Sequence, residues 1–404
     1  MIADTIARRT ALGLLSRLRT GHVVVKDALG EHHAGDRTEA PVTIRVHDAA
    51  AYRHWLAGSA GVGESYALGE WDTDDLTALL RVLVRNLGPI EAVADRWYRL
   101  TNPVIDPVRR RRRPDLDRDR VNIRTHYDLG NDFFASFLDP TVTYSSAVFE
   151  HPGQDLQAAQ EAKLDRLCRK LDLGPDDHLV EVGTGWGSMA IHAARHYGCR
   201  VTTTTISAAQ HAEASARVQA AGLADRVDVR CQDYRLLEGR YDKAVSIEMI
   251  EAVDWRELPT YFETLHRLVG PGGLVGLQAI VIGDDRYDRA RVATDFIKAH
   301  IFPGGCLPSV GTIARVAAES GPLDVVDLED LGRHYATTVA AWHHRLEGMD
   351  DRLPELGLDQ TFARLWSFYL RYCEAAFLER HVSVVQAVLA GRQRTSTGPS
   401  VRCV

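Results

Sequence analysis

Glycines at two-residue spacing mark a candidate ligand-binding loop. The stretch VEVGTGWGSMA, residues 180–190, places Gly183, Gly185 and Gly187 after a short apolar run and before a helical pattern. Because glycine lacks Cβ, such a loop adopts positive φ without strain and lets backbone N–H groups approach a ligand closely. The loop therefore predicts a site for a nucleotide-bearing ligand where a strand turns into a helix.

The spacing of the glycines distinguishes two classes of cofactor. A nicotinamide-binding loop has the pattern Gly-x-Gly-x-x-Gly, with an acidic residue about 20 positions later for the ribose. Here the third glycine comes one residue early, the acid Glu181 precedes the loop, and the next strand ends in TTTTIS without an acid. Glu-x-Gly-x-Gly-x-Gly is the pattern of S-adenosylmethionine methyltransferases, whose cofactor is cationic and has no pyrophosphate. We therefore expect Glu181, Gly183, Gly185 and Gly187 to bind S-adenosylmethionine.

The elements that would position this loop alternate between helix and strand from about residue 160. Helical patterns occupy residues 162–173, 188–198 and 208–222, and short apolar strands are expected at residues 178–183, 199–207, 227–233, 242–250 and 272–282. Such alternation implies parallel pairing through right-handed crossovers. The sequence predicts an α/β, doubly wound, Rossmann-like class I methyltransferase domain with helical additions.

The amino-terminal part of the chain has a different pattern. An amphipathic helix at residues 2–19 precedes a strand at 42–48, a glycine-punctuated segment at 61–71 and an apolar helix at 76–87. Residues 103–120, PVIDPVRRRRRPDLDRDR, combine prolines and charge runs without an apolar period, which is typical of a domain boundary. We expect a smaller α+β domain at 1–115 and the methyltransferase domain at 116–404.

Composition limits the partners and the compartment. The net charge of −7 argues against nucleic-acid binding, whereas arginines cluster at Arg8, Arg9, Arg17, Arg19 and 109–113 and would suit an anionic membrane surface. The apolar run 274–282 is too short to span a bilayer, and the six cysteines show no metal-ligand spacing. We expect a cytoplasmic protein, peripherally associated with the inner face of the membrane and without a metal site.

Further motifs indicate a family. The motifs are HYDLGNDFFASFLDPTVTYSSAVFE (126–150), TISAAQ (205–210), SIEMIEAV (246–253), DFIKAHIFPGGCLPS (295–309), HYATTVAAWHHR (334–345) and FYLRYCEAAF (368–377). From about residue 40 to about 390, the chain resembles the cyclopropane-fatty-acyl-phospholipid synthase family. GVGESYALGEW (61–71) extends the resemblance to the longer members. The resemblance implies methyl transfer from S-adenosylmethionine to the cis double bond of an unsaturated acyl chain in a membrane phospholipid, by a homodimer.

The resemblance also assigns roles to individual positions. Cofactor contacts are implied at Tyr144, Ser145, Gly183, Gly185, Thr205, Ile206, Ser207, Gln210, Cys231 and Gln232. A bound bicarbonate, which acts as the base in this family, would be held by Ser146, Glu251, Gln278, Ile280 and Tyr335. Ser146 replaces a cysteine of the family and Gln278 a histidine, but both can donate hydrogen bonds to an oxyanion. Cys373 matches a cysteine sometimes labelled a nucleophile, although a thiol in an apolar helix more often packs.

Three functions stay open on the sequence. Attack of the alkene on the sulfonium methyl leaves a carbocation that must be shielded from water and lose a proton, to bicarbonate or to Glu251. Loss of a proton from the added methyl closes a cyclopropane, which is the product we expect. A hydride shift before that step gives a methylene-branched chain, which a partner reductase would saturate to a 10-methyl fatty acid. The third alternative is an inactive lipid-binding subunit.

Overall fold

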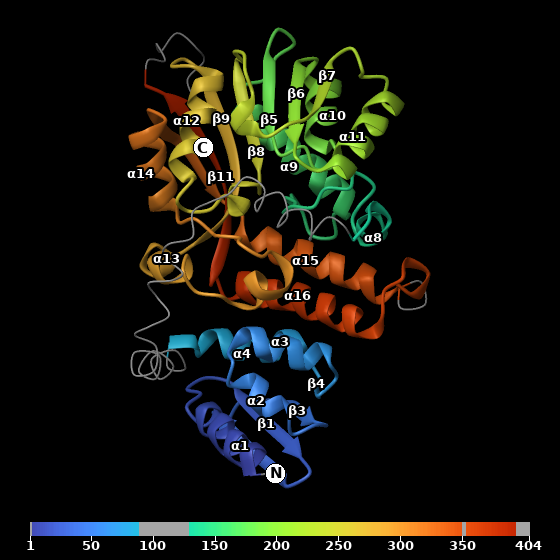
Figure 1. The fold of residues 1–404 in the computed structure, drawn as a ribbon, viewed down its shortest axis with the longest axis vertical. Coiled ribbons are helices and arrows are strands. Elements are labelled where there is room, and N and C mark those ends of the chain that lie inside the picture. Colours follow the sequence, from blue (N-terminus) through green and yellow to red (C-terminus); the bar gives the residue numbers. More distant parts are fainter. Residues whose placement is uncertain (1, 89–128, 350–352, 393–404) are drawn as a thin grey trace. The chain divides into compact units, whose positions relative to one another are not determined.

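The computed structural model describes residues 2–88, 129–349 and 353–392 (Figure 1). The chain forms two compact units: the first combines the described part of 1–115 with 294–303 and 342–381, and the second contains the rest. The predicted boundary segment 103–120 lies outside the described residues, as does the arginine run 109–113. The first unit therefore also includes segments that the sequence placed in the methyltransferase domain.

The second unit is built on a sheet of seven strands in the order β10–β11–β9–β8–β5–β6–β7 (Figure 1). The predicted strands are present and pair in parallel: β5 (His178–Val182), β6 (Arg200–Thr205), β7 (Val227–Cys231), β8 (Lys243–Ile247) and β9 (Leu274–Ile282). Two strands that the sequence did not predict, β10 (Leu323–Asp330) and β11 (Val382–Gly391), extend the sheet in antiparallel orientation. The α/β fold is confirmed, with a mixed rather than a purely parallel sheet.

The predicted helices of this unit are also present. They are α9 (Leu156–Lys170), α10 (Ser188–Tyr197) and α11 (Ala208–Ala220), accompanied by α8 (Asn131–Phe137), α12 (Leu258–Val269), α13 (Asp284–Ala290) and α14 (Val310–Ser320). Helix α15 (Gly332–Glu347) begins in this unit, and its residues from 342 onward belong to the first unit. Short 3₁₀ turns follow β7 and β8, namely η1 (Tyr234–Leu236) and η2 (Ile250–Ala252). Asp155 is the N-cap of α9 and Ser207 is the N-cap of α11, because each side chain accepts a hydrogen bond from a first-turn N–H.

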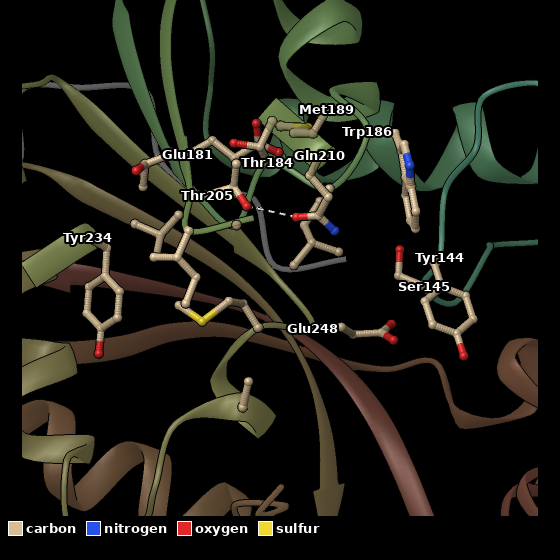
Figure 2. A pocket seen from close by; sticks show the side chains of 18 of the residues that line it. Tyr144, Ser145, Glu181, Thr184, Trp186, Met189, Thr205, Gln210, Tyr234 and Glu248 are labelled. Carbon is tan, nitrogen blue, oxygen red and sulfur yellow. Dashed lines mark hydrogen bonds between the residues drawn. The ribbon is translucent and has the colours of Figure 1, made fainter. Parts of the chain in front are cut away.

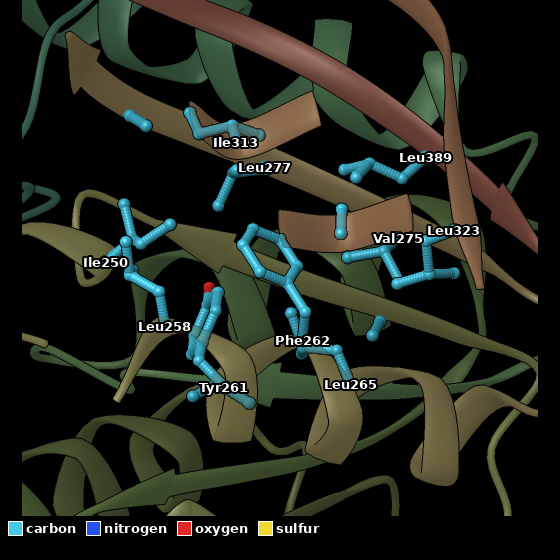
Figure 3. Packing of buried hydrophobic residues seen from close by; sticks show 14 of the residues in the cluster. Ile250, Leu258, Tyr261, Phe262, Leu265, Val275, Leu277, Ile313, Leu323 and Leu389 are labelled. Carbon is cyan, nitrogen blue, oxygen red and sulfur yellow. The ribbon is translucent and has the colours of Figure 1, made fainter. Parts of the chain in front are cut away.

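Each face of the sheet is covered by a hydrophobic core. Val180 and Val182 of β5 belong to the core formed with α12 and α14, whereas Leu179 joins the core formed with α9 and α10. Figure 3 shows Phe262 and Leu277 of the first of these cores. Because side chains alternate along a strand, Glu181 faces the α9 side. On β9, a Cβ at Gly276 would lie 3.0 Å from Leu171, so glycine allows close packing of the segment that ends α9.

The first unit is a smaller α+β structure. Its sheet has the order β2–β1–β3–β4, with β1 (His22–Asp27), β2 (Gly30–Gly35), β3 (Pro41–Val46) and β4 (Trp71–Thr73). Its helices are α1 (Ile2–Leu15), α2 (Ala51–Trp55), α3 (Ser59–Ala67), α4 (Leu76–Arg85) and α16 (Gln360–Leu378), with a π-helical turn, η3 (Ile297–Ile301). The expected helix at 2–19 ends at Leu15.

The glycine-punctuated segment 61–71 forms most of α3 and leads into β4. A Cβ at Gly63 would lie 2.3 Å from the ring of Phe296, and one at Gly61 would lie 2.0 Å from the His54 carbonyl oxygen. These glycines are therefore explained by close packing inside the first unit, where α16 lies against α3 and α4. Among the described helices, none is both long and apolar enough to cross a membrane.

Candidate active site

A pocket opens at the carboxyl ends of β5, β6 and β8, where the glycine loop turns into α10 (Figure 2). Gly183, Gly185 and Gly187 have φ values of 100°, 52° and 87°, a conformation that L-residues with a Cβ rarely adopt. The Gly183 N–H donates to the Thr204 carbonyl oxygen over 3.1 Å and joins the loop to β6. The glycine spacing thus corresponds to an observed turn, as the sequence predicted.

Most of the predicted cofactor contacts line this pocket. They are Tyr144, Ser145, Glu181, Gly183, Gly185, Thr205, Ile206, Gln210 and Gln232. Gly187 instead begins α10 in the left-handed conformation, and Ser207 begins α11. Thr205 Oγ1 donates to Gln210 Oε1 over 2.8 Å, which orients the amide in the pocket (Figure 2). Cys231 is exposed at the end of β7 and does not line the pocket.

Glu181 is a buried carboxyl group in the wall of the pocket. Its Oε2 atom has no hydrogen-bond partner among the described residues, and burial raises its pKa to about 8. An unpaired buried acceptor is costly unless a ligand supplies a donor or a positive charge. Glu181 and the glycine loop therefore fit a cationic nucleoside cofactor such as S-adenosylmethionine.

Helix α9 positions the segment that carries Tyr144 and Ser145. Gln160 Nε2 donates to the Thr143 and Ser145 carbonyl oxygens over 3.2 and 2.8 Å. Lys163, which is fully buried, donates from Nζ to Ser145 Oγ over 2.7 Å. Burial lowers the pKa of Lys163 to about 8, while the negative charge of Glu248 opposes that shift. This side of the pocket is thus fixed by buried polar contacts.

A second glutamate, the partly buried Glu248, lies in the same pocket wall (Figure 2). Its carboxylate accepts hydrogen bonds from Ser146 N over 2.8 Å, Gln278 Nε2 over 2.7 Å and the Tyr335 hydroxyl over 2.6 Å. Burial raises its pKa, although these three donors act in the opposite direction. Its φ of 48° ends β8 at Ile247, so the predicted strand 242–250 is too long at its carboxyl end.

Sequence reasoning did not identify Glu248 as a site residue. SIEMIEAV contains two glutamates, and the resemblance assigned a role only to the second, Glu251. The first glutamate within that motif, an ionisable side chain, was the available signal. A positive φ at a residue other than glycine is strained and is found preferentially at functional sites, but it appears only in the structure.

Glu251, on η2, is the other member of a carboxyl pair. Its Oε1 accepts a hydrogen bond from Ile280 N, and its Oε2 has no partner among the described residues. Burial, followed by the negative charge of Glu248, raises its pKa to about 8, so it is protonated at neutral pH. Its backbone oxygen accepts a hydrogen bond from Cys306 N over 2.7 Å, which joins η2 to a loop more than 50 residues later in the sequence.

The five positions predicted to hold bicarbonate come together around Glu248 and Glu251. We call this group the carboxylate cluster: Ser146, Glu248, Glu251, Gln278, Ile280 and Tyr335.

Cys373 lies on α16 in the first unit and does not line the pocket. Burial strongly raises the pKa of its thiol, which disfavours the thiolate that a nucleophile requires.

Several pocket residues carry no recognisable sequence signal. They are Trp186, Met189, Asp233, Tyr234, Met249 and Asp254, among others. The Phe134 ring lies 5.3 Å from Tyr144 and 5.1 Å from Trp186, centroid to centroid. Aromatic side chains therefore border the pocket on the side opposite to Tyr234 (Figure 2).

Comparison with known proteins identifies the family. Residues 115–387 match the family described as mycolic acid cyclopropane synthetase. The chain belongs to this family. It is 40% identical to the tuberculostearic acid methyltransferase UfaA1 of Mycobacterium tuberculosis, over 96% of this chain and 90% of the relative. It is 33% identical to the cyclopropane-fatty-acyl-phospholipid synthase of Escherichia coli, over 87% and 88%.

Solved structures agree with this assignment. The cyclopropane synthase MmaA2 of Mycobacterium tuberculosis superposes with a TM-score of 0.63 at 28% identity, over 67% of this chain and 98% of that protein. The mycolic acid cyclopropane synthase CmaA1, complexed with SAH and CTAB, superposes with a TM-score of 0.62 at 30% identity, over 67% and 97%. The protein is an S-adenosylmethionine-dependent methyltransferase with the class I fold.

Proposed function

We propose that the protein transfers the methyl carbon of S-adenosylmethionine to the cis double bond of an unsaturated phospholipid acyl chain and forms a methylene-branched chain. The observation that carries this proposal is the pair Glu248 and Glu251, both partly buried beside the cofactor pocket. A carbocation needs negative charge nearby, a proton acceptor and exclusion of water, and this pair supplies the first two.

The residues have separable tasks in this reaction. Glu181, the glycine loop and Gln210 would hold S-adenosylmethionine, which supplies an electrophilic methyl group. The rings of Tyr144 and Trp186 exclude water and offer π faces to the developing cation. Glu248 supplies a fixed negative charge, because three donors hold its carboxylate in place.

The product depends on when the added methyl loses a proton. A small movable base can follow the methyl and close the ring at once. A side-chain carboxylate fixed by hydrogen bonds cannot follow the added methyl, so a neighbouring hydride has time to shift first. Deprotonation of the rearranged cation then leaves an exocyclic methylene. The name of UfaA1 refers to tuberculostearic acid, a methyl-branched fatty acid, and its similarity extends over 96% of this chain.

The product can be tested in a host without its own synthase. The protein is expressed alone with an oleoyl phospholipid pool, and proton spectra of the extracted fatty esters are recorded. Vinylidene signals support the proposal, whereas high-field cyclopropyl signals would establish the ring that we expected from the sequence. Mass alone does not separate the two products, because they are isomers. Failure to bind S-adenosylmethionine in calorimetry would favour an inactive lipid-binding subunit instead.

The remaining partners follow from this chemistry. A methylene-branched product requires a separate reductase to reach the 10-methyl chain. The substrate lies in a membrane, so we propose peripheral binding to an anionic surface on the cytoplasmic side, through exposed Arg9, Arg17 and Arg19 together with Ile6, which is 62% exposed. A homodimer would let one subunit hold the surface while the other reacts.

A further inference from the structure

The positions assigned to bicarbonate are already engaged by side chains of the protein. Ser146 N, Gln278 Nε2 and the Tyr335 hydroxyl all donate to Glu248, and Ile280 N donates to Glu251. The Ser146 hydroxyl donates to the Ala147 carbonyl oxygen over 3.1 Å. These donors are therefore already used by acceptors of the protein itself. The residues at the expected bicarbonate site do not fit a bound bicarbonate ion.

We infer that the Glu248 carboxylate occupies the bicarbonate position and is itself the base, so that this enzyme works without dissolved bicarbonate. The inference rests on the proposed function for the identity of the reaction. Its structural part, an anion site filled by the chain's own carboxylate, stands on the contacts of Glu248 alone.

The amide of Gln278 cannot turn to serve another anion. Its Oε1 accepts a hydrogen bond from Gln386 Nε2 over 3.0 Å, across the β9–β11 pair in which the two residues are opposite each other. Gln386 Nε2 also donates to the Lys163 carbonyl oxygen over 3.3 Å. Gln278 Nε2 therefore faces Glu248 and, over 3.3 Å, the Ser146 carbonyl oxygen. Both donor directions of this amide are used.

Charge also disfavours a bound anion at this place. Glu248 and Glu251 are both partly buried, and the negative charge of Glu248 helps to raise the pKa of Glu251. Bicarbonate would add a further negative charge beside them. Lys163 contributes a positive charge near Glu248, which favours one ionised carboxylate in the cluster.

The proton transfer balances without another reactant. After methyl transfer, a hydride shifts from the methylated carbon to its neighbour, so the positive charge moves to the carbon that carries the new methyl group. One C–H bond of this methyl group then breaks and an O–H bond to Glu248 forms. The electron pair of the C–H bond becomes the new carbon–carbon double bond, and the positive charge is neutralised. Glu248 returns the proton to water once the product has left.

The test compares Glu248→Gly with Glu248→Gln in the full-length protein. Glycine accepts the φ of 48° without strain and opens the anion site, whereas glutamine keeps it filled but cannot act as a base. Binding of ¹³C-labelled bicarbonate is measured by NMR line broadening. Turnover is measured on unsaturated phospholipid in carbon dioxide-free buffer, with and without added bicarbonate, and calorimetry with S-adenosylmethionine checks that each variant is folded.

We expect the unchanged protein to bind no bicarbonate and its turnover to change less than twofold when the ion is added. Glu248→Gly should bind the ion, lose at least 100-fold in turnover without it, and recover at least tenfold with it. Glu248→Gln should stay inactive in both buffers.

Three results would overturn the inference. These are bicarbonate binding or a bicarbonate requirement in the unchanged protein, full activity of Glu248→Gly without the ion, and a folded Glu248→Gly that neither binds nor responds to it. If the unchanged protein modifies no unsaturated phospholipid, the proposed function fails. The NMR binding experiment still decides whether Glu248 fills the anion site.

Discussion

The two sides of the pocket differ in how their polar groups are satisfied. On the cofactor side, formed by Glu181, residues 183–187 and residues 205–210, the Glu181 Oε2 atom is buried without a partner. On the side of the carboxylate cluster, Ser146 N, Gln278 Nε2 and the Tyr335 hydroxyl are all used by Glu248. The acceptor left open in the cluster is Oε2 of the protonated Glu251, whereas the three donors are saturated. A buried acceptor without a donor favours binding of a ligand, and saturated donors leave no place for a further anion. We therefore expect the cofactor side to bind S-adenosylmethionine and the carboxylate cluster to take part in the reaction.

Among variants that leave Glu248 in place, the largest effect should come from Glu251→Gln. This change removes an ionisable group from the carboxylate cluster but leaves the amide oxygen able to accept from Ile280 N. Positioned acids and bases contribute about 10²–10⁴-fold, so we expect a loss of that order in turnover with unchanged affinity for S-adenosylmethionine. Steady-state kinetics and calorimetry measure the two quantities.

The matched control is Glu319→Gln, which alters an exposed carboxylate on α14 that pairs with Arg315. It should change neither turnover nor cofactor affinity. Near-normal turnover of Glu251→Gln would remove Glu251 from the reaction and leave Glu248 as the acting carboxylate of the pair.

The same contrast explains how much could be predicted from the sequence. The glycine loop is local, because a strand, a turn and a helix lie within 20 residues of each other, and its spacing alone indicated the cofactor class. The parallel strands were predictable for the same reason, since each is a short apolar run between helices. The cofactor side of the pocket was therefore largely predictable from the sequence.

The carboxylate cluster required tertiary structure. Ser146, Glu248, Gln278 and Tyr335 come from four separate segments, and only the fold shows that they share hydrogen bonds. Strand β11, which orients Gln278 through Gln386, begins more than 90 residues after β9 ends and has no helix-alternation signal. The resemblance named most of these positions, but it could not show that Glu248 fills the space between them.

The next effect concerns stability and pH. The pKa of Glu181 is raised to about 8, so the folded protein holds a proton that the unfolded chain releases above about pH 4.5. Stability from this group is therefore present at low pH and is lost as pH rises towards 8. At about 1.4 kcal/mol per pH unit, the loss between pH 5 and 7.5 is about 3 kcal/mol.

Glu181→Gln should remove this part of the pH dependence. Urea unfolding at pH 5 and 7.5 measures the difference, and Glu319→Gln serves again as the exposed control. An identical pH dependence in Glu181→Gln and the unchanged protein would mean that Glu181 is ionised in the folded state. The difference between the two sides of the pocket would then rest on the saturated donors to Glu248 alone.

A smaller effect is expected from Gly185→Val, which tests the cofactor side alone. No atom lies within 4 Å of a Cβ built at Gly185, so the cost comes from its positive φ and from the space that the ligand needs. Gly222 also has a positive φ, 68°, and no atom within 4 Å, but it does not line the pocket. Gly222→Val is therefore a matched control for backbone strain.

Both glycine variants should lose about 1–2 kcal/mol of unfolding free energy, because a side chain in the left-handed conformation is strained. Only Gly185→Val should lose about 100-fold in S-adenosylmethionine affinity, measured by calorimetry. Equal affinities in the two variants would refute the assignment of the loop, whatever their stabilities.

The smallest effect should arise outside both sides of the pocket, at the membrane surface. Arg9 is exposed on α1, and each basic residue near an anionic leaflet contributes about 1 kcal/mol, which fades with salt. Arg9→Gln should therefore weaken binding to anionic vesicles about fivefold at low ionic strength and leave binding to S-adenosylmethionine unchanged. Arg315→Gln, which changes an exposed side chain of α14 in the second unit, is the control and should bind vesicles normally. Vesicle sedimentation at two salt concentrations measures the effect. Binding that is equally strong to zwitterionic vesicles and does not change with salt would contradict this prediction. It would show that apolar contacts, rather than arginines, bring the enzyme to its lipid substrate.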